Sequence, residues 1–295
     1  MTAKQQDVWD PQTGIMNFDV SPQELAVAES ARIRTEWAER HAELGDSDRL
    51  RSFTERLGRE WAIETGIIEN LYDIDRGVTQ TLIERGFQES FLQHGSVNKE
   101  PAYIQALLED QKGALENLFG YVKQDRQLTV GYIKELHAMM TRSQPVTDAM
   151  TPTGERLEVP LIHGDWKREP NFPFRNGVQY RYCPPEQTAS EMGRLVEMHL
   201  RHIDEGVAPE VEAAWLHHRF TQIHPFQDGN GRVARAIASL VLICSGMFPM
   251  IVPREEKTIY LQTLELADGG NLAPLVRLIS RGQEAAFRKA SDLLL

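Results

Sequence analysis

Residues 223–235 read Ile-His-Pro-Phe-Gln-Asp-Gly-Asn-Gly-Arg-Val-Ala-Arg, and they are the most informative stretch of the chain. An apolar, helix-like segment ends near Ile223, because Pro225 and the Gly-Asn-Gly run do not continue a helix. A second helix is predicted from Gly231 to about Ser245, since apolar residues recur there at helical spacing, namely Val233, Ile237, Leu240, Val241 and Cys244. The glycines therefore stand at a helix N-terminus, where exposed N–H groups and the helix dipole favour a bound anion.

Polar side chains around this helix start suit a polyphosphate. Arg232 and Arg235 are three residues apart, so they project from neighbouring positions on the helix, away from the apolar residues. Two guanidinium groups beside an anion site favour a polyphosphate over a single phosphate. Asp228 can bind Mg²⁺, which proteins hold through one or two carboxylates plus substrate phosphates. His224 readily exchanges a proton near neutral pH, so the stretch contains the groups that nucleotidyl transfer needs.

Two simpler interpretations apply to the same residues. The Asp-Gly-Asn-Gly run is also typical of a structural turn, but a turn alone does not account for the histidine and the two arginines beside it. A calcium-binding loop is excluded, because Arg232 and Val233 occupy the positions that require an oxygen ligand and a glycine.

Helical hydrophobic patterns predominate along the rest of the chain. Between residues 59 and 86 apolar residues recur every three or four positions, which predicts one long helix. Thr129 is a candidate N-cap for the helix that follows it. The other predicted helices cover residues 22–57, 102–121, 130–142, 185–202, 210–223, 256–267 and 272–294.

Two segments depart from this pattern. Residues 143–183 contain several prolines that rule out a continuous helix, and residues 174–180 predict a β-hairpin there. Asn176 and Gly177 supply the positive φ angles that a two-residue hairpin turn requires. Residues 1–21 are polar and predict a loose N-terminal arm. The sequence therefore predicts a mainly α protein with one small β element.

Composition narrows the class of protein further. The 295 residues include 32 basic and 43 acidic side chains, for a net charge of -11, and this acidic balance disfavours a nucleic-acid binder. No run of apolar residues is long enough to span a membrane, and the first twenty residues do not resemble a signal peptide. We therefore expect a cytoplasmic protein in which Cys183 and Cys244 are free thiols.

The stretch 224–235 matches the motif His-x-Phe-x-(Asp/Glu)-Gly-Asn-Gly-Arg-x-x-Arg, and the chain resembles the Fic (filamentation induced by cAMP) domain family. Residues 164–167, 184–185, 216–220 and 267–276 resemble further family segments, so that the resemblance covers roughly residues 128–278. It implies a Fic-type helical bundle with a small β-hairpin flap. The implied domains are the arm, residues 1–21; an N-terminal helical region with an inhibitory helix, residues 22–127; and a Fic core with C-terminal helices, residues 128–295.

The resemblance also implies an activity, the transfer of AMP from ATP to a Ser, Thr or Tyr hydroxyl of a target protein. His224 would be the general base, Phe226 a loop anchor, and Asp228 the ligand of the Mg²⁺ cofactor. The phosphates would be bound by the backbone N–H groups of Gly229, Asn230 and Gly231 and by the side chains of Arg232 and Arg235. The hairpin turn at Asn176 and Gly177 would be the flap that aligns the target by strand addition.

An upstream segment resembles the family's inhibitory motif (Ser/Thr)-x-x-x-Glu-(Gly/Asn). Thr65 and Glu69 lie one helical turn apart, and Asn70 follows them. The resemblance implies that Glu69 pairs with Arg235, where a carboxylate competes with phosphate for the same guanidinium group. An exposed helix face is the simpler interpretation of Glu69.

Several functions remain open at this point. A relative with an inhibitory Glu can also remove AMP from a modified target by hydrolysis, and a nucleotide-sensing module without turnover is a third reading. A DNA-binding regulator is disfavoured by the acidic composition. The resemblance implies ATP and a target protein as partners, with the protein itself among the targets, and it allows a homodimer. The target's identity and the nucleotide base are not specified by the motif.

Overall fold

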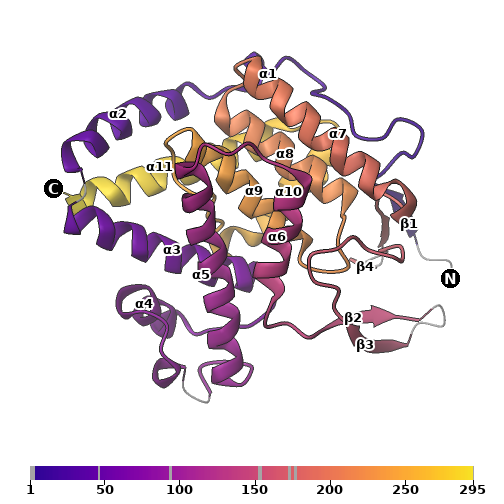
Figure 1. Cartoon of the computed structure of the whole chain (residues 1–295), viewed down its shortest axis with the longest axis horizontal. Coiled ribbons are helices and arrows are strands. Elements are labelled where there is room, and N and C mark those ends of the chain that lie inside the picture. Colours follow the sequence, from indigo (N-terminus) through magenta and orange to yellow (C-terminus); the bar gives the residue numbers. More distant parts are fainter. Residues whose placement is uncertain are drawn as a thin grey trace.

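The computed structural model describes residues 4–45, 47–92, 95–151, 155–171, 174–175 and 178–294. The protein is mainly α-helical, as predicted (Figure 1). The helices are α1 (Pro22–Leu25), α2 (Ala28–Leu44), α3 (Asp48–Ile68), α4 (Arg76–Arg85), α5 (Pro101–Lys123), α6 (Val130–Thr141), α7 (Pro185–Asp204), α8 (Pro209–Ile223), α9 (Asn230–Cys244), α10 (Lys257–Asp268) and α11 (Ala273–Leu294), with 3₁₀ turns at Glu89–Phe91 and Arg254–Glu256. The strands are β1 (Lys4–Asp7), β2 (Val146–Met150), β3 (Arg156–Pro160), β4 (Phe174–Arg175) and β5 (Val178–Arg181).

Helices α8 and α9 form the centre of the molecule, with the other helices packed around them (Figure 1). Every residue of α8 except Thr221 is buried, and α9 is buried along nearly its whole length. A helix that is enclosed on all sides must satisfy its polar groups inside the protein. The loop that joins these two helices is therefore held on a rigid, buried support.

The N-terminal helical region shares its core with the predicted Fic core. Trp61 and Ile68 of α3 belong to the same apolar cluster as the buried residues of α8 and α9, and the Trp61 indole donates a hydrogen bond to Ser239 Oγ at 3.2 Å. This packing joins the predicted N-terminal helical region, residues 22–127, to the predicted Fic core, residues 128–295. The predicted helical segment 22–57 contains α1, α2 and the start of α3.

The prediction of one helix over residues 59–86 is wrong. Helix α3 ends at Ile68, Asn70 adopts a positive φ of 55°, and α4 begins only at Arg76. The apolar spacing continues across this break because Tyr72 is also buried, with its hydroxyl bonded to Ala62 O at 3.0 Å. Hydrophobic spacing alone does not distinguish such a buried turn from a helix.

The described part of the N-terminal arm, residues 4–21, is not loose. Strand β1 pairs in parallel with β5, and Trp9 and Ile15 are buried. The Ile15 N–H donates to Glu191 Oε2 on α7 at 2.8 Å, and the Trp9 indole donates to Gln187 Oε1 at 3.1 Å. The arm therefore packs along α7 and α8 as part of the fold.

Two hairpins leave the helical body. Strands β4 and β5 pair antiparallel, as predicted for residues 174–180, and the turn residues Asn176 and Gly177 lie outside the described residues. The hairpin of β2 and β3 was not predicted; it pairs Val146 with Pro160 and projects from the body (Figure 1). Its first strand begins close to the loop between α8 and α9, as the contacts below show.

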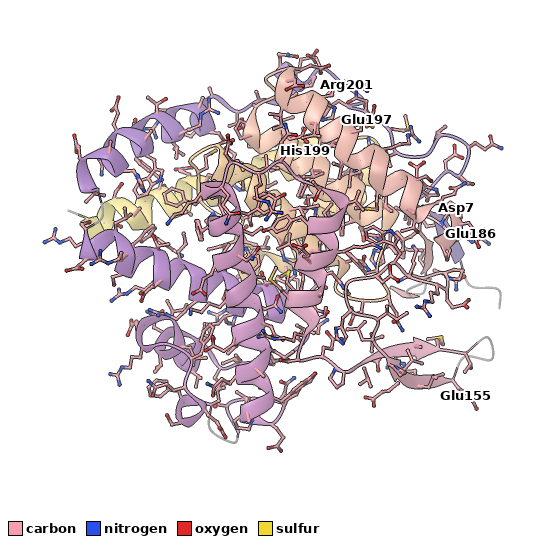
Figure 2. All side chains as sticks on the ribbon, viewed as in Figure 1. Asp7, Glu155, Glu186, Glu197, His199 and Arg201 are labelled. Carbon is pink, nitrogen blue, oxygen red and sulfur yellow. The ribbon has the colours of Figure 1, made fainter. Side chains whose placement is uncertain are left out.

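The outer surfaces of the helices carry charged side chains, such as the Glu197 and Arg201 ion pair on α7 (Figure 2). Both cysteines are free, with Cys183 buried and Cys244 exposed. Within the described part of the chain, none of the helices combines the length and apolar character needed to cross a bilayer.

Candidate active site

The loop between α8 and α9, residues 224–229, is closed by its own side chains. Helix α8 ends where His224 adopts a left-handed conformation, with φ of 50° and ψ of 58°. Across the loop, the Asn230 side chain accepts from the Phe226 N–H and donates to the Phe226 carbonyl, both at 2.8 Å. Phe226 is fully buried and stacks on His137 with a centroid distance of 3.8 Å. Phe226 thus anchors the loop in the core, and Asn230 fixes its curvature.

Residues that sequence analysis assigned no role hold the loop from outside. His137 on α6 accepts from the Gly164 N–H at Nδ1 (2.9 Å), so its Nε2–H donates to the Asp228 carbonyl (3.0 Å). Lys167 donates from Nζ to the Ile223 carbonyl at 3.1 Å. Burial lowers the pKa of His137 to about 4 and that of Lys167 to about 8. Lys167 belongs to the segment 164–167, whose resemblance to the family could have drawn attention to it. For His137 the sequence indicates only that it lies on a predicted helix.

The geometry of His224 suits a general base. Its half-buried ring places Nδ1 3.2 Å from the Thr221 carbonyl. Because a carbonyl only accepts, Nδ1 carries the proton of the neutral ring, and Nε2 is the basic nitrogen. Tyr182, which follows β5, stacks on the imidazole with centroids 4.1 Å apart and 8° between the planes. The ring is therefore oriented from both its edge and its face.

Asp228 presents an ionised carboxylate beside the glycines. Burial opposes ionisation, but the Arg232 charge and hydrogen bonds from Gln144, Gly229 and Thr147 outweigh it and lower the pKa of Asp228. Oδ1 accepts the Gly229 N–H at 2.6 Å, and the side chain is 36% exposed. No cluster of three or more His, Cys, Asp or Glu side chains suited to a metal occurs in the described ranges. A single ionised carboxylate suits the kind of Mg²⁺ site in which substrate oxygens complete the coordination.

The two motif arginines lie inside the protein, on a helix buried along nearly its whole length, whereas the helical spacing had placed them only away from its apolar residues. Arg232 is fully buried and donates to the Met140 carbonyl at 3.1 Å and to Gln144 Oε1 at 2.7 Å. Arg235 is 1% exposed and donates to the Thr65 carbonyl at 3.2 Å. Both guanidinium groups are thus fixed by protein acceptors beneath the start of α9.

Glu69 lies against the predicted anion site. Its Oε1 is 2.8 Å from Arg235 Nη2, which is the ion pair that the resemblance implied. A methyl group added at Gly231 would come within 2.3 Å of Glu69 Oε1, so the carboxylate covers the backbone at the start of α9. Burial disfavours the Arg235 charge, but Glu69 and Tyr260 together hold the pKa of Arg235 above its usual value. Glu69 reaches this position from the C-cap of α3.

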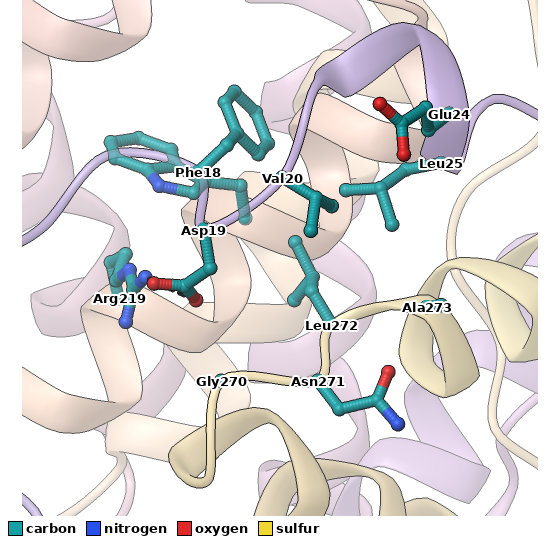
Figure 3. A pocket seen from close by; sticks show the side chains of 11 residues that line it. Phe18, Asp19, Val20, Glu24, Leu25, Arg219, Gly270, Asn271, Leu272 and Ala273 are labelled. Atoms are coloured by element: carbon teal, nitrogen blue, oxygen red, sulfur yellow. Dashed lines mark ion pairs between the residues drawn. The ribbon is translucent and has the colours of Figure 1, made fainter.

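The structure therefore brings together His224, Asp228, the glycines, both arginines and Glu69. A separate cavity of about 290 Å³ lies between the N-terminal arm and the loop before α11, as Figure 3 shows. Its lining includes Phe18, Trp215, Leu272 and the ion pair of Arg219 with Asp19 at 3.5 Å, and none of the predicted site residues.

Parts of this chain are similar in sequence to known proteins. The model of the Fic/DOC family matches residues 127–242. Protein adenylyltransferase fic-1 of Caenorhabditis elegans is 32% identical over 111 residues, which are 37% of this chain and 22% of that protein. Protein adenylyltransferase Fic of Drosophila melanogaster is 40% identical over 68 residues, 23% of this chain and 14% of that protein. The matched stretch thus spans about a fifth or less of the curated relatives.

Solved structures share the fold. A Fic domain containing signaling protein from Bacteroides thetaiotaomicron superposes with a TM-score of 0.69 at 22% identity, over 90% of this chain and 97% of that one. Fic-1 from C. elegans gives a TM-score of 0.70 at 21% identity, over 92% of this chain and 72% of that one. At these identities the likeness establishes the fold. With the family match and the motif, it identifies residues 127–242 of this chain as a domain of the Fic/DOC family.

Proposed function

We propose that this protein is an adenylyltransferase that moves AMP from ATP to a hydroxyl of a target protein and is held in check by Glu69. The observation that carries the proposal is the Glu69 carboxylate against Gly231 and 2.8 Å from Arg235. A carboxylate at the start of α9 indicates that this position stabilises negative charge, as helix N-termini do. The names of the curated relatives support the same chemistry.

The proposed reaction uses groups already in place. The hydroxyl oxygen of the target attacks the α-phosphorus of ATP while Nε2 of His224 takes the hydroxyl proton. The bond between the α-phosphorus and its bridging oxygen breaks, and pyrophosphate leaves with the electron pair. Asp228 would hold Mg²⁺, which would supply charge neutralisation at the phosphate oxygens. The backbone N–H groups of Asn230 and Gly231 stabilise charge that develops on the phosphates, whereas the Gly229 N–H is already bonded to Asp228 Oδ1.

Glu69 restrains this reaction by competition. The γ-phosphate of ATP and the Glu69 carboxylate both require Arg235, and the carboxylate already lies at 2.8 Å from it. Arg235 is buried and held by the Thr65 carbonyl, so it cannot turn to a second anion elsewhere. ATP therefore binds productively only after Glu69 leaves the start of α9.

The test measures label incorporation from α-labelled ATP with Mg²⁺, for the wild type, Glu69→Gly, and Glu69→Gly combined with His224→Ala. We expect Glu69→Gly to raise nucleotide transfer, including self-modification, about tenfold or more. Adding His224→Ala should then lower transfer by about 10³-fold, which is in the range for loss of a general base.

Glu60→Gln is the matched control, because Glu60 lies on the same helix and pairs with Lys289, not with α9. Its transfer rate should equal that of the wild type. Equal incorporation by the wild type and Glu69→Gly would contradict the inhibitory role of Glu69. Transfer that persists after His224→Ala would contradict the role of His224 as the general base.

Hydrolytic removal of AMP from a modified target is the second candidate, favoured by the place of Glu69 in the site. Its side chain is 26% exposed and reaches the backbone of Gly231, where it can contact a water beside a bound phosphate. An AMP-modified target should then release AMP with the wild type and not with Glu69→Gly. Transfer by Glu69→Gly without any release by the wild type would leave the first candidate alone.

A further inference from the structure

Gln144 lies between the two charged side chains that the proposed function assigns to metal and phosphate. Its Nε2 donates to Asp228 Oδ2 at 2.6 Å, and its Oε1 accepts from Arg232 Nη2 at 2.7 Å. Gln144 is 7% exposed, so these bonds form with little competition from water. One amide group thus connects the carboxylate to the guanidinium.

The polarity of the two neighbours fixes the orientation of this amide. A carboxylate only accepts and a guanidinium only donates, so a flipped amide would face each neighbour with the wrong group. Arg232 is held in turn by the Met140 carbonyl at the end of α6. The Gln144 side chain therefore has one favourable arrangement, and Asp228 Oδ2 takes its direction from it.

Two further donors complete the support of the carboxylate. Thr147 on β2 donates to the same Oδ2 at 3.1 Å, and the Gly229 N–H donates to Oδ1 at 2.6 Å. Arg232 contributes charge at 3.7 Å from Oδ2 without a close bond. The two side-chain donors are far from Asp228 in sequence: Gln144 lies between α6 and β2, and Thr147 lies on β2. The contacts of Gln144 and Thr147 with Asp228 give the stretch that follows α6 a direct part in the site.

We propose that Gln144 is a positioning residue that aligns the Asp228 carboxylate for a nucleotide-bound divalent cation, with Thr147 as a second, weaker support. The inference rests on the proposed function, since it concerns the carboxylate that binds the cation of ATP. Partners that orient a metal-binding group typically change metal affinity by about 10–100-fold when they are removed. The role predicts a loss that depends on the metal, not a general loss of binding.

The experiment measures the dissociation constant of ATP by calorimetry, with Mg²⁺ and with chelator, in the full chain carrying Glu69→Gly. The quantity compared is the factor by which Mg²⁺ strengthens ATP binding. Gln144→Met keeps the volume and removes both hydrogen bonds; Thr147→Val removes one donor and leaves the Arg232 bond intact. We expect the Mg²⁺ factor to fall about tenfold for Gln144→Met and about threefold for Thr147→Val.

Gln283→Met is the matched control. Gln283 is a buried glutamine that accepts from the Phe248 N–H at 2.9 Å and donates to the Phe248 carbonyl at 3.0 Å, so its loss also breaks two hydrogen bonds. Its melting temperature should fall as that of Gln144→Met does, while its Mg²⁺ factor stays at the Glu69→Gly value.

The outcomes separate the two proposals. An unchanged Mg²⁺ factor in both Gln144→Met and Thr147→Val, or an equal loss of affinity with and without Mg²⁺, would overturn the positioning role alone. If the Glu69→Gly parent failed to bind ATP both in the presence of Mg²⁺ and in the presence of chelator, the proposed function and this inference would both be overturned. Should Gln144→Met fail to fold, Thr147→Val decides the question, because it leaves the buried Arg232 bonds in place.

Discussion

The loop 224–229 and the Glu69 segment, residues 65–75, both lie beside the start of α9 but are held by different means. The loop is closed by Asn230 and clamped from outside by His137 and Lys167, all of them buried. The Glu69 segment includes the last turn of α3, and Arg254 fixes its two ends through Glu64, just before it, and through the Ile74 carbonyl (2.7 Å). The loop is thus held by hydrogen bonds within and around it, whereas Arg254 fastens the Glu69 segment at its two ends.

This difference has a functional meaning. A restraint must be removable without deforming the catalytic groups, which requires that its fastenings be separate from theirs. Arg254 bonds Glu64 and Thr79, on either side of the Glu69 segment, and Asn230 bonds Phe226 within the loop. Changes in the loop should therefore abolish activity, and changes at the edges of the Glu69 segment should raise it.

The largest effect should follow from opening the loop. Asn230→Ala leaves the buried Phe226 N–H without its acceptor, although Asn171 still bonds the Phe226 carbonyl at 3.0 Å. We expect a loss of about 3 kcal/mol in the free energy of unfolding and, in the Glu69→Gly background, about 100-fold slower transfer. Urea unfolding and label incorporation measure the two. Asn271→Ala, at an exposed asparagine of the cavity lining, serves as the control; a loss below about 0.5 kcal/mol for Asn230→Ala would contradict self-closure.

The next effect concerns the external clamp and depends on pH. Burial lowers the pKa of Lys167 from 10.5 to about 8, so the unfolded chain binds more protons than the folded one between these values. The stability contributed by Lys167 therefore rises with pH across this window, by about 2 kcal/mol between pH 8 and pH 10. The difference in unfolding free energy between the wild type and Lys167→Met should grow by this amount. Cys183 titrates in both proteins and largely cancels; a constant difference would show that Lys167 is not desolvated.

The motif and the helices around it could be predicted because their signals are local. The start of α9 was placed within one residue, at Gly231 against Asn230, since Pro225 and the glycines interrupt a helical pattern within a few positions. The Thr129 cap was also found, and its Oγ accepts the Tyr132 N–H at 3.1 Å. Such features need no knowledge of the rest of the chain.

Features that depend on distant partners were missed. The helical spacing placed Arg232 away from the apolar residues of its helix but did not reveal its burial, because its acceptor Gln144 lies 88 positions away and a single helix pattern does not register it. The end of α3 was missed because Tyr72 is buried against the helix itself, so close to Gly66 that a Cβ there would lie 2.1 Å from its hydroxyl. The N-terminal arm is polar on average, and its contact with the core depends on a few scattered apolar residues such as Trp9 and Ile15.

A smaller effect is expected at the edge of the Glu69 segment. Arg254→Lys keeps the charge but loses the fork that bonds Glu64, Ile74 and Thr79 together. We expect about 1 kcal/mol lower stability and about threefold faster transfer in the otherwise wild-type chain, because Glu69 leaves the site more often. With Glu69→Gly already present, Arg254→Lys should add no further gain. Arg288→Lys, at an exposed pair with Glu284, is the control and should change neither quantity.

The smallest effect tests which edge matters more. Lys257 Nζ donates to Asn70 Oδ1 at 2.7 Å, directly after Glu69, but the bond is exposed and so contributes about 0.3 kcal/mol. Lys257→Met should therefore raise transfer by less than about twofold, below the gain from Arg254→Lys. If Lys257→Met raised transfer more than Arg254→Lys does, the Glu69 segment would open beside Asn70 while α3 stays packed in place. The ranking of these two variants thus distinguishes a local turn that releases Glu69 from a movement of the whole end of α3.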